Sequence, residues 1–514
     1  MGSDQKALNA LAKGAGVTAI AMGVSKILSY LYRIIIARFV GPDAYGQLSL
    51  GLMVVGIGGT LGLLALNRGL QKFIPEYRTY NDLAKIKGIV LSSLYIAIPA
   101  SLLVTLTIFF GAEFIAIELF ESPRLVPVLK ILSIAPFFSA LSSIFFDTTV
   151  GFNKIIYKAG TVRILQNLIQ LIVTIALVII GFEVAGAAWG WITGTIVAAL
   201  LGLYFMEKKV GPILLSDVKP EYQYKKLVIF SSPLLLSGII GTVMGWADTA
   251  FLGYYMSDAD VGLYNAALPT AMLILLPHQA IGSLAVSSFS ELKERNRENV
   301  EDSLQTATYW VFALVFPTFL VMLLFSKQVL TLLFGSQYSS AYLSLSILAS
   351  GYLISTSVGR VGSVLHSTGH TNYILYNNLA AVTLNIILNI MLIPQYGIIG
   401  AAIATSSSII FTNLLMFAEV WKKESIISIP YKKIRRILVI GIIPLLIVTG
   451  LDRIFFTNTP YWFLFPAVIT YYFLYAATFL RFIGLGEEEK KVLIRTGEKM
   501  GYKEEMRKII SKLS

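Results

Sequence analysis

Long apolar stretches alternate with short polar connections along almost the whole chain. Most stretches hold about 20 residues, the length that an α-helix needs to cross the hydrocarbon core of a bilayer. The pattern therefore predicts an all-α protein with about fourteen membrane-spanning helices. The spans are expected near residues 14–37, 44–66, 88–110, 125–147, 159–180, 185–206, 227–252, 262–286, 304–325, 340–365, 373–393, 398–420, 437–455 and 460–482.

The composition agrees with this interpretation. Hydrophobic residues make up 56% of the chain and charged residues 14%, and the mean hydropathy is +0.73, which excludes a water-soluble globular protein. The first apolar stretch is too long for the central region of a cleavable signal peptide, so we expect it to remain as a span. The chain contains no cysteine, and neither disulfides nor thiolate metal sites are expected.

Lysine and arginine are concentrated in every second connection between the predicted spans. Because short cytoplasmic loops of membrane proteins carry an excess of these residues, the basic connections and both termini are predicted to be cytoplasmic, in a multi-pass protein of the plasma membrane. This asymmetry accounts for the net charge of +12, and no nucleic-acid partner is expected. The basic connections contain Arg68, Lys72, Arg78, Lys85 and Lys87, then Lys154 and Lys158, then Lys208, Lys209, Lys219, Lys225 and Lys226, then Lys293, Arg295 and Arg297, then Lys422, Lys423, Lys432, Lys433, Arg435 and Arg436, and finally the tail from Arg481 to Lys512.

The chain also contains an internal repeat. The segment "ARFVGPDAYGQLSLG" resembles "GYYMSDADVGLYNAA", with Gly46 aligned to Gly262, and a second pair of similar segments aligns Gly186 with Gly400. Six spans separate the copies, and because six is an even number the copies are predicted to form two parallel six-helix bundles with a cleft between them. The expected division is an N-terminal bundle (1–206), a cytoplasmic linker (207–226), a C-terminal bundle (227–423), two additional spans (424–482) and a cytoplasmic amphipathic tail (483–514).

Two stretches resemble a known family. Residues 25–77, "SKILSYLYRIIIARFVGPDAYGQLSLGLMVVGIGGTLGLLALNRGLQKFIPEY", combine a cationic span, a glycine-proline loop and a basic segment, and "NIILNIMLIPQYGIIGAAIAT" follows at 385–405. They are similar to the polysaccharide-export flippases of the multidrug/oligosaccharidyl-lipid/polysaccharide (MOP) superfamily, which include Wzx-type O-antigen flippases and the related lipid II flippases. The resemblance implies that an oligosaccharide on a polyprenyl phosphate or pyrophosphate is turned from the cytoplasmic to the outer leaflet.

Two cations, Lys26 and Arg33, share one face of the first predicted span. Each costs about 2.5 to 3.5 kcal/mol in hydrocarbon, and Lys26 lies too deep for its side chain to reach either interface. Lys26 is therefore expected either to line a polar cavity or to pair with a buried acid, and Arg33 either to line the cavity or to extend to the outer interface. In the lipid II flippases two arginines of the first span face the cavity. The resemblance puts Lys26 at the first of these positions and Arg33 within one residue of the second, so both are candidate ligands of the headgroup phosphate.

Two further arginines are candidates for the same role. Arg360 is expected about 9 Å inside the inner end of the tenth span, among small residues. Arg68 closes the second span, where it is either an ordinary positive-inside residue or, by the resemblance, lies at the mouth of the cavity. Lys130 and Arg163 lie nearer to an interface and are expected to be snorkelling anchors.

Acidic and amide side chains within spans are rarer. Asp248, in the seventh span, is predicted either to pair with a first-span cation or to bind a coupling Na⁺ or proton. Asn385 and Asn389 share one face of the eleventh span and either bind sugar hydroxyls or join helices by hydrogen bonds. Asp147, near the inner end of the fourth span, is expected to be interfacial. No metal site and no resident cofactor is expected.

Two charge-rich segments carry apolar residues at helical spacing. These are residues 67–87 and the tail 483–514. Both are expected to form amphipathic helices that lie on anionic lipid headgroups.

Three classes of function are compatible with this pattern. The first is a flippase for lipid-linked oligosaccharide that works by alternating access. The second is a cation-coupled exporter of small molecules on the same fold, against which the cationic first span argues. The third is an integral-membrane enzyme, which needs a larger extramembrane loop than this chain has, so the protein is not expected to be an enzyme. The expected partners are the substrate lipid and membrane lipids. A monomer suffices, and enzymes of glycan assembly are left open as further partners.

Overall fold

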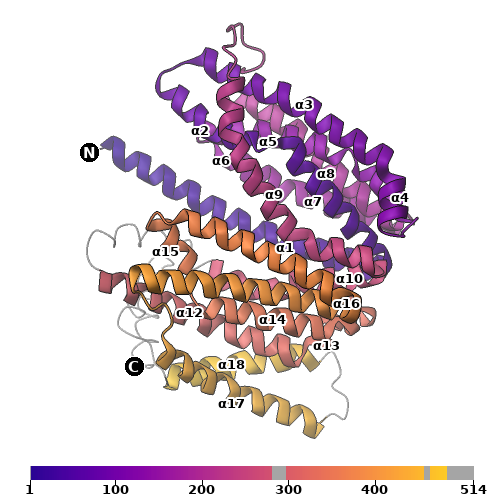
Figure 1. Cartoon of the computed structure of the whole chain (residues 1–514), viewed down its shortest axis with the longest axis vertical. Coiled ribbons are helices and arrows are strands. Elements are labelled where there is room, and N and C mark those ends of the chain that lie inside the picture. The colour runs from indigo at the N-terminus through magenta and orange to yellow at the C-terminus, as the bar shows by residue number, and fades with distance from the viewer. Residues whose placement is uncertain (1, 280–296, 456–462, 483–514) are drawn as a thin grey trace. The chain divides into compact units, whose positions relative to one another are not determined.

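The computed structural model describes residues 2–279, 297–455 and 463–482 (Figure 1). Within these ranges the chain is helical and contains no strand, in agreement with the all-α prediction. The predicted tail and most of the basic loop around Lys293 lie outside the described residues. The first ten helices are α1 (Gly2–Leu63), α2 (Leu66–Thr79), α3 (Leu83–Glu113), α4 (Leu125–Leu132), α5 (Ala135–Gly151), α6 (Ile155–Gly160), α7 (Gln166–Ile179), α8 (Glu183–Phe205), α9 (Tyr224–Tyr255) and α10 (Asp258–Met272). The later helices are α12 (Arg297–Leu324), α13 (Ser326–Phe334), α14 (Tyr342–Ser357), α15 (Val361–Ser367), α16 (Thr371–Glu424), α17 (Tyr431–Phe455) and α18 (Leu464–Phe482).

Short π and 3₁₀ turns extend several of these helices. The π turns are η1 (Phe114–Leu119), η2 (Thr161–Leu165) and η3 (Met206–Val210), and the 3₁₀ turns are η4 (Leu273–Leu275) and η5 (Ser336–Ala341). Of the described helical segments, ten are long and apolar enough to cross a bilayer, or eleven if the bent pair that ends in α14 and α15 is one span. The protein is therefore a multi-pass membrane protein, while the count of fourteen spans stays a prediction.

Two of the helices are far longer than one crossing requires. The 54 residues of α16 would extend about 81 Å if straight, against about 30 Å of hydrocarbon. Each long helix is interrupted at a glycine with positive φ: Gly41 in α1 has φ 80° and Gly397 in α16 has φ 54°. Glycine adopts such angles without the steric cost of a side chain. These two breaks coincide with the gaps between predicted spans.

The contacts divide the chain into two compact units. Unit 1 comprises Met1–Pro269, Leu333–Ala341 and Val382–Ala404. Unit 2 comprises Thr270–Leu332, Tyr342–Ala381 and Thr405–Ser514. The division at residues 206 and 227 that the repeat predicts stays a prediction.

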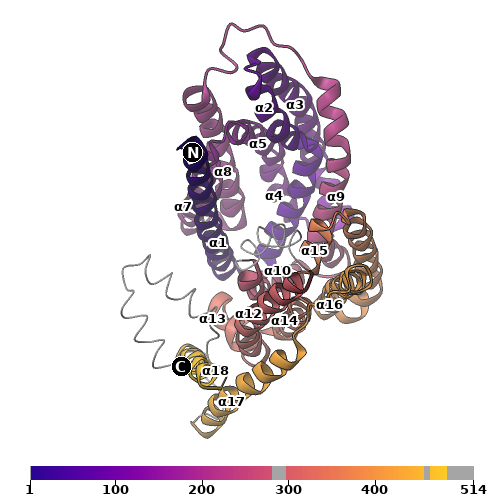
Figure 2. The same cartoon turned by 90° about the vertical axis from the view of Figure 1, so that its left-hand side faces the viewer.

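In unit 1, helix α8 packs against α5 and α7, and α3 packs against α1 and α5 (Figure 2). The amphipathic segment predicted after the second span forms α2, but its apolar face does not lie on lipid. Leu70, Phe73 and Ile74 of α2 are almost fully buried in one cluster with residues of α3 and α5. The prediction of a membrane-surface helix was wrong at this point because a protein core is an equally good partner for an apolar helix face.

The N-terminal end of α3 is held by polar contacts. Asp82 caps the helix, with its carboxylate accepting from the Lys85 amide at 3.0 Å. The hydrogen bond from the Lys85 side chain, with the one from its amide, holds the pKa of the Asp82 carboxyl below its usual range. Because that pKa is lowered by folding, this contribution to stability is present at neutral pH and is lost as the pH falls through the folded-state pKa. The predicted linker also contacts the start of α3, since the Glu221 amide donates a hydrogen bond to the Ala84 carbonyl at 3.0 Å.

In unit 2, α12 packs against α14 and α17, and α17 and α18 lie side by side (Figure 1). The Tyr475 hydroxyl of α18 donates to the Ala313 carbonyl of α12 at 2.8 Å. A second apolar cluster joins α12, α15 and the last part of α16 through Leu304, Val361 and Val420. The buried tyrosine on α18 thus fixes its position on α12 as well as adding apolar area.

Candidate functional site

A buried carboxylate on α9 is the centre of a polar cluster in unit 1. The side chain of Asp248 is 7% exposed. Its Oδ2 accepts a hydrogen bond from the Tyr264 hydroxyl of α10 at 2.5 Å. Its Oδ1 accepts from the amide groups of Asn389 at 2.8 Å and Asn385 at 3.1 Å, both on α16. These four residues are called the Asp248 cluster below.

Helical spacing explains how two amides reach one carboxylate. Asn385 and Asn389 are four residues apart and so lie one turn apart on the same face of α16. The Asn389 amide also donates to Asn385 Oδ1 at 3.1 Å, and the two residues are 0% and 5% exposed, respectively. Both amides therefore join α16 to α9 by hydrogen bonds, one of the two roles predicted for them, and binding of sugar hydroxyls stays a prediction.

Tyr264 was not recognised from the sequence. It is fully buried, and it lies sixteen residues after Asp248 on the next helix. The signal that could have found it is a tyrosine in the first half of a predicted span, since a buried tyrosine hydroxyl normally finds a polar partner.

The Asp248 cluster is suited to respond to a small cation. Three donors offset the desolvation cost of the buried carboxylate. Asn389 Oδ1 is buried and accepts no hydrogen bond from the described residues. A carboxamide presents its oxygen and its NH₂ group from nearly the same place, so rotation would offer an oxygen ligand beside the carboxylate. A proton on Asp248 would instead add a donor where three donors already point. A metal cation would require an amide group to rotate, whereas a proton on Oδ2 would require only the Tyr264 hydroxyl to turn and accept.

Hydrogen bonds link Arg33 of α1 with the surroundings of this cluster. Arg33 is half-buried, and its Nη1 donates to the Tyr45 hydroxyl at 3.3 Å. Tyr45 donates to the Asn265 carbonyl at 3.3 Å, and the Asn265 amide donates to the Thr249 hydroxyl at 3.2 Å. Since Thr249 follows Asp248 on α9, the predicted cation of the first span is connected with the residue next to the carboxylate.

The other predicted phosphate ligands of unit 1 are exposed. Lys26 lies on α1 between Ser25 and Ser29, which hydrogen-bond with Asn167 of α7 at 3.3 and 3.1 Å. Arg68 lies in the first turn of α2. The structure therefore leaves the side chains of Lys26 and Arg68 accessible, while Arg33 is partly enclosed.

Arg360 belongs to unit 2 and occupies a break between two helices. The predicted span over 340–365 is not one straight helix, because α14 ends at Ser357, Gly359 has φ 84°, and α15 is bent from α14 by 44°. Arg360 precedes α15, where its Nη1 donates to the His278 carbonyl at 3.0 Å and its Nε donates to the Ser363 hydroxyl at 3.3 Å. The Arg360 side chain thus joins the break between α14 and α15 to the backbone at His278 by a hydrogen bond.

Asp147 of α5 is a second buried carboxylate. Its side chain is 0% exposed, because other helices cover it, and its expected position at the membrane interface stays a prediction. It accepts hydrogen bonds from Lys158 at 2.6 Å, Gln71 at 2.5 Å, Ser143 at 3.1 Å and Asn67 at 3.4 Å. Asn67 and Gln71 come from α2, so the helix that covers the apolar core also covers this carboxylate.

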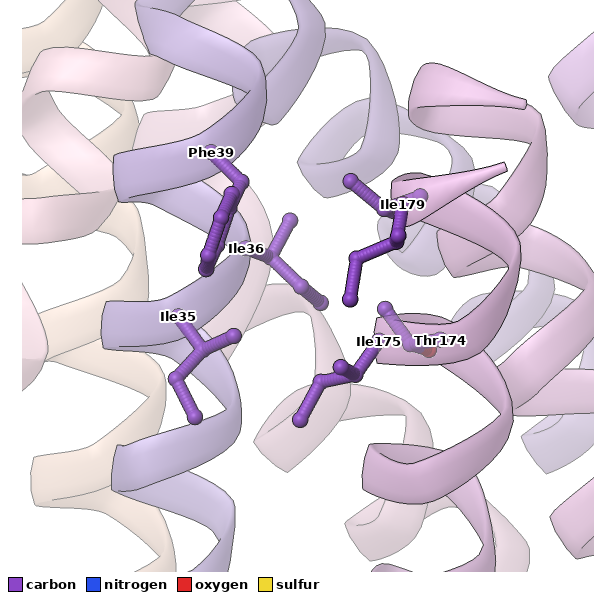
Figure 3. A pocket seen from close by; sticks show the side chains of 7 residues that line it. Ile35, Ile36, Phe39, Thr174, Ile175 and Ile179 are labelled. Atoms are coloured by element: carbon purple, nitrogen blue, oxygen red, sulfur yellow. The ribbon is translucent and has the colours of Figure 1, made fainter. Parts of the chain in front are cut away.

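A small pocket between α1 and α7 is lined almost entirely by aliphatic and aromatic groups (Figure 3). Ile35, Ile36 and Phe39 form one wall, and Ile175 and Ile179 form the other. Such walls suit hydrocarbon and offer no partner for a phosphate. The pocket is therefore not a headgroup site.

A multi-pass helical fold with carboxylates buried among its helices is typical of membrane transport proteins. The model of the polysaccharide biosynthesis protein family matches residues 35–343, and the chain belongs to this family.

The chain is 25% identical over 236 residues to the Haloferax volcanii protein named "Probable low-salt glycan biosynthesis flippase Agl15". That match covers 46% of this chain and 49% of the relative, about half of its length.

Two solved structures show the fold. The lipid II flippase MurJ in an inward closed conformation matches 90% of this chain and 97% of its own, with a TM-score of 0.69 at 18% identity. A multidrug MATE transporter of the MOP superfamily in an inward-facing conformation matches 80% of this chain and 98% of its own, with a TM-score of 0.65 at 16% identity. The MOP-superfamily membership expected from the sequence is confirmed.

Proposed function

We propose that this protein flips an oligosaccharide linked to a polyprenyl phosphate or pyrophosphate from the cytoplasmic to the outer leaflet of the plasma membrane. The observation that carries the proposal is the match to the polysaccharide biosynthesis protein family over residues 35–343. The similarity to a protein named as a glycan biosynthesis flippase supports it. The relative and the two solved structures described above are named for transport and not for catalysis, which agrees with a protein that is not an enzyme.

The proposed topology has fourteen crossings with both termini in the cytoplasm. Dividing α1 at Gly41 and α16 at Gly397 adds two crossings to the ten candidate spans. The bent pair with α14 and α15 adds one, and the apolar helix α17 adds another. A count of fourteen with six spans in each repeat supports alternating access between two parallel bundles.

In the proposed mechanism, fixed cations replace part of the hydration of the headgroup phosphate while it crosses about 30 Å of hydrocarbon. Lys26, Arg33, Arg68 and Arg360 are the candidate ligands. Lysine forms a point-charge contact where arginine would form a bidentate one, so Lys26 supports charge recognition more than recognition of phosphate geometry. The lipid tail remains in the bilayer throughout.

We further propose that Asp248 couples flipping to a Na⁺ or proton gradient. The three donors on its carboxylate come from α10 and α16, so cation binding at Asp248 would alter the contacts of three helices. A monomer suffices for this mechanism.

The first experiment tests headgroup recognition. The protein is placed in proteoliposomes with a fluorescent lipid-linked oligosaccharide, and headgroup translocation is measured for the parent, Lys26→Ala and Lys26→Arg. Flipping is expected to fall about tenfold or more in the alanine variant and to persist in the arginine variant, because one cation at the site contributes on the order of 1 to 3 kcal/mol to a charged hydrogen bond. Lys130→Ala is the control, since Lys130 is exposed and pairs with Glu113 at 2.8 Å. Equal loss in both alanine variants would contradict the role of Lys26.

The exporter hypothesis keeps one specific observation in its favour, the similarity of fold to a MATE transporter. If the parent moves no lipid-linked oligosaccharide with any of several carriers and sugars, but expels small amphiphilic cations down an ion gradient, the exporter replaces the flippase.

The second experiment tests coupling. In Asp248→Asn, the flipping rate is expected to lose its dependence on an applied Na⁺ or proton gradient, because an amide carries no charge for the cation to neutralise. Asp147→Asn removes another buried carboxylate and is expected to retain that dependence. A gradient response that persists in Asp248→Asn, or that disappears equally in both variants, would contradict coupling at Asp248.

A further inference from the structure

Helix α17 begins with a basic segment and continues as an apolar one. Its sequence "YKKIRRILVIGIIPLLIVTG" places four cations within the first two turns and aliphatic residues beyond them. A helix of this pattern crosses from the polar headgroup region into hydrocarbon at about Ile437. The boundary is therefore a place where a phosphate and an acyl chain can be bound together.

The structure has a pocket at this boundary, between α17 and α18 in unit 2. It has a volume of about 370 Å³ and is lined by Arg435, Arg436, Val439, Ile440, Ile443 and Phe482. The α17 residues span about two turns of one face, with the guanidinium groups at one end and the aliphatic groups at the other. Phe482, at the end of α18, lines the pocket as well. The lining is thus divided into a cationic end and an apolar end.

The two arginines differ in their contacts from two of the neighbouring cations, Lys433 and Lys423. Lys433 lies over the ring of Tyr309, and Lys423 of α16 lies over the ring of Tyr373. Arg435 and Arg436 are exposed, and within the described ranges no hydrogen bond or ion pair joins them to another side chain. Their charge is therefore directed to the pocket and not used in packing.

The apolar end of the pocket is exposed as well. Val439 is 57% exposed, Ile443 45% and Phe482 67%. Val439 and Ile443 belong to the part of α17 that the sequence predicts to span the membrane, and Phe482 ends α18, a candidate span, so a lipid chain is their natural neighbour. A soluble anion would satisfy the arginines but would leave this wall uncovered, whereas an anionic lipid satisfies both ends.

We propose that this pocket is a binding site for a resident anionic membrane lipid. The phosphodiester would lie against Arg435 and Arg436, and one acyl or isoprenoid chain would follow Val439 and Ile443 toward the centre of the bilayer. The helix dipole at the N-terminus of α17 adds to the attraction. The site does not depend on the transported substrate, so it stands or falls separately from the proposed function.

The test measures lipid binding to the full chain in detergent by native mass spectrometry. Phosphatidylglycerol and phosphatidylcholine with identical chains are titrated against the parent, Arg435→Gln/Arg436→Gln and Lys422→Gln/Lys423→Gln. The lysine pair removes the same charge from the same set of basic residues but does not line the pocket. Binding of the first phosphatidylglycerol is expected to be stronger than that of phosphatidylcholine in the parent. It is expected to weaken about 25-fold in the arginine variant, because each interfacial cation contributes about a factor of five. The lysine variant is expected to bind like the parent.

A second variant tests the apolar end without changing charge. Ile443→Trp fills part of the pocket and is expected to weaken retention of the first phosphatidylglycerol while the melting temperature stays that of the parent. Equal weakening by the arginine and lysine pairs, or no preference for phosphatidylglycerol in the parent, would overturn the proposal.

Glu487, Glu488 and Glu489 lie outside the described residues. Binding of these acidic side chains in the pocket, in place of a lipid, is the alternative that the experiment must exclude. If phosphatidylglycerol binds only after all three are changed to glutamine, the pocket belongs to this segment and the lipid proposal is wrong.

Discussion

The contact between Gly46 of α1 and Gly262 of α10 allows a quantitative prediction. A Cβ atom added at Gly46 would lie 1.8 Å from the Asp258 carbonyl oxygen, and one added at Gly262 would lie 2.0 Å from the Pro42 carbonyl oxygen. Each glycine thus contacts the residue four positions before the other. The pair that the repeat aligns in sequence is also in contact in space.

The change Gly46→Ala is therefore expected to destabilise the fold strongly, although it adds only one methyl group. Ordinary van der Waals contact begins near 3.4 Å, so the two backbones would have to separate by about 1.6 Å, and no side-chain rotation can relieve a clash with backbone. Overpacking of this kind costs about 1 to 3 kcal/mol, and the upper end is expected here because both partners are main chain. Separation would also weaken the bond from Gln47 to the Asp258 carboxylate, now 3.0 Å.

The assay is thermal unfolding of the detergent-solubilised protein, followed by loss of the monodisperse peak in size-exclusion chromatography. Gly46→Ala is expected to lower the melting temperature by about 5 °C or more, given a few degrees per kcal/mol. Gly59→Ala, on the same helix, is the control: a Cβ there meets nothing within 4 Å, and alanine favours helix by up to about 1 kcal/mol. If Gly46→Ala and Gly59→Ala have the same melting temperature, the close approach of α1 and α10 is incorrect.

Two further predictions concern the buried carboxylates. Tyr264→Phe removes the 2.5 Å hydrogen bond to Asp248 and is expected to lower the free energy of unfolding by about 1.5 to 3 kcal/mol, measured by thermal unfolding. Tyr254→Phe is the control, because Tyr254 is 59% exposed and its hydroxyl should contribute nothing. Equal melting temperatures of the two variants would contradict the hydrogen bond. Lys158→Ala leaves Asp147 buried without its cation and should cost about 2 kcal/mol, less than a fully buried pair because the lysine is 28% exposed. Lys130→Ala breaks an exposed pair and is the matched control; unchanged stability in Lys158→Ala would show that the amide and hydroxyl donors are sufficient.

The two buried carboxylates illustrate how a membrane protein retains acids within its helices. Both accept several hydrogen bonds: Asp147 contacts a lysine at 2.6 Å, and the donors to Asp248 include a tyrosine and two amides. An amide can turn its oxygen toward a cation. The two amides are why coupling is proposed at Asp248, and the lysine contact indicates a structural role for Asp147.

The sequence by itself determined the class of the protein and much of its fold. The need of a spanning helix for about 20 apolar residues is local, so hydropathy located most helices, and Gly41 and Gly397 fell where the chain must turn. The motifs of residues 25–77 indicated the superfamily. Lys26 and Asp248 could be singled out because a charge within an apolar segment is visible without any knowledge of its partners.

Only the tertiary structure decided which residues meet those charges. The donors to Asp248 come from positions 264, 385 and 389, and the donors to Asp147 include positions 67 and 71, separations that no local pattern encodes. The apolar face of α2 was visible in the sequence, but whether lipid or protein covers it depends on the helices that pack around it. Hydrophobicity requires only that a surface leave water, and the packing of the whole chain selects the neighbour.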